Sequence, residues 1–215
     1  MASLARAALE SLLHTKKLDR TLTRGPRPGL EYASTGHAAL DARLQGGVPR
    51  GHVSELVGPR SSGRTRLLFQ LLAAAGARGE LIALVDALDM LDVESAADAG
   101  IDLDRLLWIR GFAVPNPGLC RDLNQRALVQ AIRALTLVLQ AGQFGLVVFD
   151  AGEAPADAIR RLPFTTWLRL QRMVEGTQTA CLLIGSDRMA RSPAGLTLHA
   201  QELKNILKNI PGNAR

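Results

Sequence analysis

The residues from Gly58 to Thr65 have the types and spacing that bind a phosphate group. Their sequence is Gly-Pro-Arg-Ser-Ser-Gly-Arg-Thr, with two glycines, a basic residue and a hydroxyl at the spacing of a P-loop. An apolar run, 52–57, precedes them and a helical pattern, 66–78, follows. Such a turn directs backbone N–H groups at a phosphate, and the helix N-terminus adds its positive dipole end. We therefore assign a nucleotide-phosphate site to Gly58, Ser61, Ser62, Gly63, Arg64 and Thr65.

Arg64 stands where a P-loop carries lysine. A lysine ammonium is a compact point charge, whereas a guanidinium is a wide planar fork. The exchange predicts a loop that is poor at supporting hydrolysis, and it leaves open whether nucleotide is bound at all. The plainer interpretation is a glycine and serine turn that only joins strand to helix.

Asp150 ends the apolar run 146–150. In P-loop proteins a carboxylate at the end of such a strand holds Mg²⁺, and the hydroxyl at the position of Thr65 is a direct ligand. Many buried strands end in aspartate, so Asp150 alone is a weak signal. With the upstream loop it predicts a magnesium site formed by Thr65 and Asp150.

The composition indicates a globular intracellular protein. The chain has 215 residues, of which 47% are hydrophobic, enough for one domain with small appendages. No apolar run approaches the ~20 residues that span a bilayer, and the N-terminus lacks a signal-peptide pattern. Cys120 and Cys181 lie far apart, as expected of buried thiols in a reducing cytosol. We expect a cytoplasmic protein without membrane contacts and without a histidine or cysteine metal site.

Charge is distributed unevenly along the chain. Residues 1–66 carry 11 basic and 5 acidic side chains, 67–158 carry 6 and 12, and 159–215 carry 9 and 3. The ends are therefore basic and the middle is acidic. Basic ends suit DNA phosphates or an acidic protein surface, and a solvated surface is the plainer alternative. Aromatic residues are only 4% of the chain, which argues against a stacking platform for single strands.

The N-terminal segment 1–24 has the apolar spacing of one helix face, which includes Leu9, Leu12 and Leu13. A basic Gly/Pro linker follows at 25–33, then a core at 34–200 and a basic tail at 201–215. A helix with one apolar stripe must bury it. The stripe either folds back on its own core or docks on another subunit, which would make the protein an oligomer.

From Ser34 the chain alternates strands and helices. Near-continuous apolar strands are typical of a parallel sheet covered by helices on both faces, so we predict an α/β fold. Strands are expected at 52–57, 81–86, 106–110, 146–150, 180–185 and 196–200. Helices are expected at 38–44, 66–78, 92–99, 121–141 and 164–175. In the last of these, we expect the stripe of Phe164, Trp167, Leu168 and Met173 to pack in the core rather than form a partner groove.

Several stretches resemble bacterial RecA. They are Ser34-Thr-Gly-His-Ala-Ala-Leu-Asp41, Gly46-Gly-Val-Pro-Arg-Gly51, His52-Val-Ser-Glu-Leu-Val-Gly-Pro59, Ala83-Leu-Val-Asp-Ala87 and Ala99-Gly-Ile-Asp-Leu-Asp-Arg-Leu-Leu107. The resemblance implies a RecA-like P-loop core, ATP or ADP with Mg²⁺ as ligands, contacts with DNA, and a helix that packs on a neighbouring subunit.

The departures from RecA concern catalysis and DNA. The glutamate that RecA carries after Asp86-Ala87 is Leu88 here, and leucine cannot orient a water. Asp89 and Asp92 are nearby carboxylates, but neither matches the position. The two DNA-binding loops of RecA also look short here. We therefore predict no catalytic residues and no enzyme activity beyond residual ATPase.

Shorter stretches resemble the ImuA group of RecA-like proteins. They are Leu106-Leu-Trp-Ile-Arg110, Arg160-Arg161-Leu162 and Ala190-Arg-Ser-Pro-Ala-Gly-Leu-Thr-Leu198. That resemblance implies an accessory role in SOS-induced translesion synthesis, with an ImuB-like relative of Y-family polymerases and RecA as partners and a location at the nucleoid. The alternative is an active DNA-dependent ATPase or recombinase. The segment that faces DNA in RecA contains Arg160, Arg161, Arg169, Arg172, Arg188 and Arg191.

Overall fold

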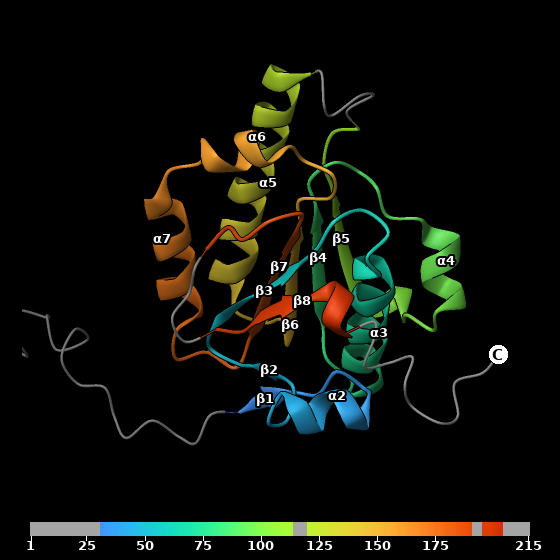
Figure 1. Cartoon of the computed structure of the whole chain (residues 1–215). Helices are drawn as coiled ribbons and strands as arrows, with labels where there is room; N and C mark the ends of the chain where they lie inside the picture. The colour runs from blue at the N-terminus through green and yellow to red at the C-terminus, as the bar shows by residue number, and fades with distance from the viewer. Residues whose placement is uncertain (1–30, 114–119, 191–194, 204–215) are drawn as a thin grey trace, which may run out of the picture. The chain divides into compact units, whose positions relative to one another are not determined.

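A six-stranded parallel sheet organises the protein (Figure 1). The computed structural model describes residues 31–113, 120–190 and 195–203. The strand order is β5-β4-β6-β7-β3-β8, and every neighbouring pair is parallel. The strands are β3 (Val53–Val57), β4 (Ile82–Asp86), β5 (Leu106–Arg110), β6 (Leu146–Asp150), β7 (Ala180–Gly185) and β8 (Thr197–His199). The parallel sheet predicted from the apolar runs is thus confirmed.

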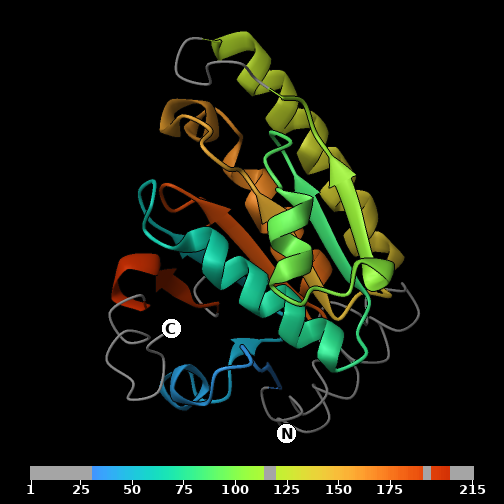
Figure 2. The same cartoon turned by 90° about the vertical axis from the view of Figure 1, so that its right-hand side faces the viewer.

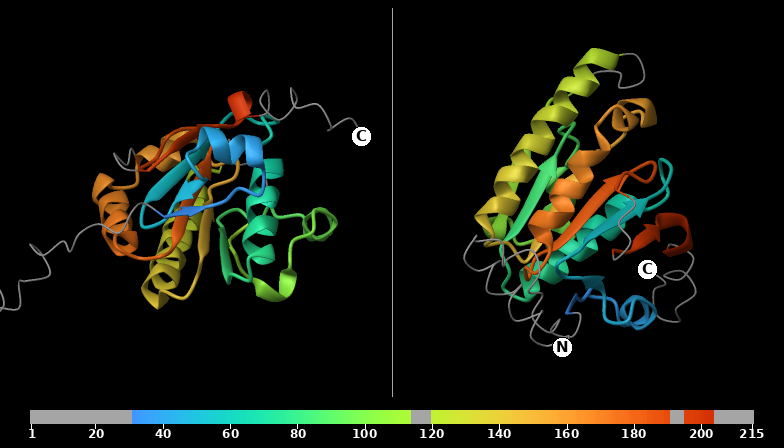
Figure 3. Two further views of the ribbon diagram at one scale, coloured as in Figure 1. Left: turned by 90° about the horizontal axis from the view of Figure 1, so that it is seen from below. Right: turned by 90° about the vertical axis from the view of Figure 1, so that its left-hand side faces the viewer.

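Helices cover both faces of this sheet. One apolar layer is covered by α3 (Arg64–Ala77) and α4 (Val93–Asp98), which lie in front in Figure 2, together with α2 (Ala38–Arg43), which lies at the bottom of that view. The other carries α5 (Arg121–Ala141), α6 (Ala156–Arg160) and α7 (Phe164–Val174), seen in front in the right panel of Figure 3. A short antiparallel pair, β1 (Tyr32–Ala33) and β2 (Val48–Pro49), lies beside α2, and a 3₁₀ turn, η2 (Leu103–Arg105), leads into β5.

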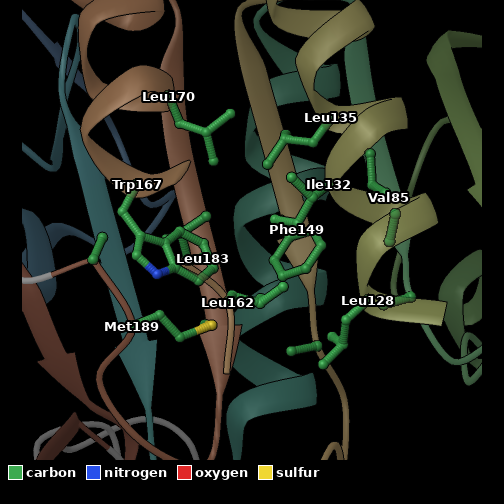
Figure 4. Packing of buried hydrophobic residues seen from close by; sticks show 14 of the residues in the cluster. Val85, Leu128, Ile132, Leu135, Phe149, Leu162, Trp167, Leu170, Leu183 and Met189 are labelled. Atoms are coloured by element: carbon green, nitrogen blue, oxygen red, sulfur yellow. The ribbon is translucent and has the colours of Figure 1, made fainter. Parts of the chain in front are cut away.

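The core has one apolar layer on each side of the sheet. The central strands β4 and β6 are buried along nearly their whole length, because helices cover both of their faces. On the α5 side, Leu128, Ile132 and Leu135 line the buried stripe of that helix. Figure 4 shows this layer, where the rings of Phe149 and Trp167 meet edge to face with centroids 6.5 Å apart. Trp167, expected in the core, is confirmed there.

Two side chains of α7 correct the sequence-based expectation. Phe164 and Leu168 were expected to share a buried stripe with Trp167, but their exposed fractions are 57% and 44%. The helix instead turns Trp167, Leu170 and Val174 toward the sheet. The α7 face that carries Phe164 and Leu168 is therefore exposed in the described structure.

The predicted elements agree with the structure to within one or two residues at their ends, and short elements were missed. Residues 32–33, predicted as linker, pair with β2. Residues 200–203 are helical, and Leu203, predicted in the tail, packs in the core. The predicted N-terminal helix with Leu9, Leu12 and Leu13 lies outside the described residues, as does Arg191.

Candidate phosphate-binding site

The loop between β3 and α3 has the backbone of an anion-binding turn. Ser61 and Gly63 both have positive φ, 61° and 99°, so the chain makes two left-handed steps before the helix begins. Gly63 is the N-cap of α3, and no side chain caps the helix there. The N–H groups in the first turn of α3 therefore point out of the N-terminal end of the helix, which is the end that attracts anions.

Gly58 and Ser62 pack tightly against each other at the start of the loop. A Cβ at Gly58 would lie 2.6 Å from Ser62 Oγ, so this position requires glycine. The Gly58 N–H donates to the Gly185 carbonyl at 3.2 Å, which joins the loop to the end of β7. Ser62 is 2% exposed, and its Oγ has no hydrogen-bond partner in the described structure. A buried hydroxyl without a partner is costly unless a ligand satisfies it.

Arg64 is buried and is directed toward the loop that follows β6. Its Nη1 donates to the Gly152 carbonyl at 3.2 Å, and its Nη2 donates to Glu153 Oε1 at 2.6 Å. The exposed fraction of the Arg64 side chain is 9% and that of Glu153 is 31%. Both ends of the guanidinium fork are thus engaged within the chain. Thr65, in contrast, is exposed.

Asp150 lies at the carboxyl end of β6, close to this ion pair. Its Oδ1 accepts a hydrogen bond from the Gly152 N–H at 2.7 Å. Burial raises the pKa of the Asp150 carboxyl to about 6; Asp86 and Glu153 add to the rise, whereas the Gly152 N–H and Arg64 oppose it. A cation bound here would stabilise the ionised form. Thr65 and Asp150 thus supply oxygen ligands of the kind that Mg²⁺ takes, and among the described residues no group of three or more His, Cys, Asp or Glu side chains forms a metal cage.

The end of the neighbouring strand β4 has a different character. Asp86 is paired in register with Asp150, but it is buried and accepts from the N–H groups of Met90 and Leu91 at 3.0 and 2.8 Å. Its carboxylate also lies 3.4 Å from Trp108 Nε1. Asp86 therefore fixes the loop after β4. Leu88, in that same loop, is 2% exposed and belongs to the apolar core.

The two remaining carboxylates of this loop have partners. Asp89 forms two hydrogen bonds of 2.8 Å with Arg110, and these hold the pKa of Asp89 below its usual range. Asp92 accepts a hydrogen bond from the Ser95 hydroxyl. Both carboxylates are therefore engaged by neighbouring side chains in the described structure.

The sequence is similar to those of several bacterial RecA proteins. The RecA N-terminal domain family matches residues 20–118. RecA of Nitratiruptor sp. is 46% identical over 123 residues, which are 57% of this chain and 32% of that protein. RecA of Heliobacterium modesticaldum is 30% identical over 174 residues, 74% of this chain and 46% of that protein. The chain thus spans about a third to a half of the length of the curated relatives it matches.

A solved structure shares the fold across the described core. The RadB recombinase covers 81% of this chain, and 79% of that chain is covered in turn, with a TM-score of 0.50 and 18% sequence identity. The domain has a RecA-like fold. Its phosphate loop, Asp86 and Asp150 all lie at the carboxyl ends of the strands, where open parallel sheets bind their ligands.

The predicted DNA-facing arginines of the RecA-like core differ in their surroundings. Three have acidic partners: Arg160 lies 3.6 Å from Asp187, Arg161 lies 3.3 Å from Asp157, and Arg188 lies 3.8 Å from Glu55. Arg169 and Arg172 lie on the exposed face of α7. The five described arginines lie on α6 and its C-cap, on α7 and in the loop after β7, and their contact with DNA stays a prediction.

Sequence reasoning missed Glu153 and the role of Asp86. A buried arginine needs a counter-ion, and Glu153 follows Asp150 by three residues, but the burial of Arg64 is known only from the structure. Asp86 ends an apolar strand as Asp150 does, but its burial depends on the loop that it caps. None of the described helices is long and apolar enough to cross a membrane.

Proposed function

We propose that this protein is a RecA-like accessory factor of damage-induced translesion synthesis that does not hydrolyse nucleotide. In this role it binds an ImuB-like relative of Y-family polymerases and RecA in the cytoplasm, at the nucleoid, and works through protein contacts rather than through ATP turnover. The proposal combines the RecA-like fold with the ImuA-like stretches of the sequence.

One observation carries the non-hydrolytic part of the proposal. Leu88 occupies the position of the RecA glutamate and is packed in the core at 2% exposure. A leucine held there cannot orient or deprotonate an attacking water, and Asp89 is tied to Arg110. The pairing of Arg64 with Glu153 supports the same conclusion, since the basic residue at the position of the P-loop lysine already has a carboxylate partner.

The exposed face of α7 supports the role in protein contacts. Phe164 and Leu168 present apolar surface beside Arg169 and Arg172. Aromatic and arginine side chains are enriched in protein interfaces, and such a mixed surface suits an acidic, partly apolar partner. DNA contacts, where they occur, would be phosphate-driven, weak and steeply salt-dependent.

An active DNA-dependent ATPase or recombinase is the second candidate. It is favoured by the intact backbone of the phosphate loop and by the sequence relation to RecA. The chain matches less than half the length of those RecA proteins, so their activity is not carried over to it.

Complementation of damage-induced mutagenesis tests the accessory role. In a strain that lacks this gene, Thr65→Ala and Arg64→Ala should restore mutagenesis almost fully, provided that circular dichroism shows an intact fold. The double reversal Arg169→Glu with Arg172→Glu should abolish it and weaken the pull-down of the polymerase relative. Loss of mutagenesis in Thr65→Ala, with the α7 variant unaffected, would instead make the nucleotide site essential and replace the accessory role.

A further inference from the structure

The Glu153 carboxylate accepts a hydrogen bond from Arg64, the arginine that a bound phosphate would need. The guanidinium of Arg64 binds anions best through two parallel N–H bonds from its fork. In this structure Nη2 is bonded to the Glu153 carboxylate and Nη1 to the Gly152 carbonyl. Each bond uses an N–H of one terminal nitrogen, so a phosphate that binds both ends of the fork competes with these two adjacent residues.

Arg64 is well shielded from solvent, whereas the Glu153 side chain is 31% exposed. Arg64 is 8% exposed as a residue, and it extends from the first turn of α3 to the loop that joins β6 to α6. A charge-assisted hydrogen bond of 2.6 Å with one largely buried partner is worth more than an exposed ion pair. Since Glu153 belongs to the same chain, its carboxylate also competes at a high effective concentration, in the millimolar range or above.

We propose that Glu153 is an internal anion that closes the phosphate loop and sets its nucleotide affinity. This proposal deepens the proposed function, since it explains how a P-loop is kept without a working ATPase. The ligand class is a nucleoside di- or triphosphate with Mg²⁺, which must displace the Glu153 carboxylate from Arg64. Glu153 is therefore a determinant of affinity, and the loop between β6 and α6 is the part of the chain that moves when nucleotide binds.

The binding of ADP in the presence of Mg²⁺, followed by calorimetry on the full chain, tests the proposal. Glu153→Gln keeps the size of the side chain and removes its charge, so ADP should bind about tenfold more tightly or better, the equivalent of one lost charge-assisted bond. Adding Arg64→Ala to Glu153→Gln should remove the gain. Glu153→Ala provides a second variant in case the amide substitution disturbs the fold.

Glu80→Gln is the matched control. Glu80 accepts hydrogen bonds from Arg50 at 2.5 Å and from Arg78 at 2.8 Å, just before the amino end of β4, whereas the phosphate loop lies at the carboxyl ends of the strands. Breaking these pairs should leave ADP affinity unchanged. An equal gain in Glu80→Gln would show general loosening of the fold and overturn the proposal.

The other possible results distinguish the role of Glu153 from the accessory function. Unchanged or undetectable ADP binding in both Glu153 variants overturns the role of Glu153 and leaves the accessory function standing. Rapid ATP turnover by the wild-type protein would remove the accessory function, whereas a gain of affinity in Glu153→Gln would still establish Glu153 as the internal anion.

Discussion

The loops that follow strands β3 and β4 differ in character. After β3, the left-handed Gly63 and the uncapped start of α3 preserve a turn suited to a phosphate. After β4, the loop has become core: Leu88 is buried and Asp86 is used to fix the backbone. In the proposed account, holding an anion and activating a water therefore depend on different residues, one set after β3 and the other after β4.

The first prediction tests whether Leu88, in the loop after β4, stabilises the core. Leu88→Ala should lower the free energy of unfolding by about 2–5 kcal/mol, because it removes buried apolar volume and leaves a cavity. Chemical denaturation measures this loss. Leu81→Ala is the control, since Leu81 is 44% exposed, and should change stability by only about 0.5 kcal/mol. Equal, small effects of both variants would mean that Leu88 is not part of the core.

The second prediction concerns the pH dependence that Asp150 confers. Its folded-state pKa of about 6 lies above the ordinary value of 3.8, so the folded protein binds more protons between these values. The stability from this group is therefore fully present below about pH 4 and is lost as pH rises through about 6.

Asp150→Asn should thus stabilise the metal-free protein by about 1–3 kcal/mol at pH 7.5 and leave it almost unchanged at pH 4. The amide oxygen can still accept the Gly152 N–H. Thermal unfolding in EDTA at several pH values measures this difference. A constant difference between variant and wild type across the pH range would contradict a raised pKa.

The third prediction tests whether the backbone of the phosphate loop contributes to ADP binding as well as to stability. Gly63→Ala forces a side chain into a left-handed conformation and should cost about 1–2 kcal/mol. Gly79 also has a positive φ, 77°, with open space where a Cβ would be added. Gly79→Ala should therefore lower the free energy of unfolding by about the same amount. Only Gly63→Ala should also weaken ADP binding, measured in the Glu153→Gln background. Equal effects of the two variants on ADP binding would refute a role of the loop backbone.

The sequence predicted the sheet because its strands are continuous apolar runs, a pattern that only double-sided burial explains. It also predicted the glycine-rich turn between a strand and a helix, since glycine spacing reflects the backbone directly; phosphate binding by this turn stays a prediction. It did not reveal that Phe164 and Leu168 face outward, because the spacing of α7 allows two apolar stripes and only tertiary packing selects one. The Arg64–Glu153 pair likewise joins loops that are 89 residues apart, a distance that no local pattern encodes.

ATP turnover in the presence and absence of single-stranded DNA tests the central claim most directly. A carboxylate that activates water typically contributes a factor of ~10²–10⁴, so its replacement by Leu88 should leave turnover at background in both conditions. Glu153→Gln should bind nucleotide without hydrolysing it faster. DNA-stimulated turnover by the wild-type protein at an ordinary ATPase rate, above about 10⁻² per second, would contradict the account, because it would require a general base that the loop after β4 does not provide.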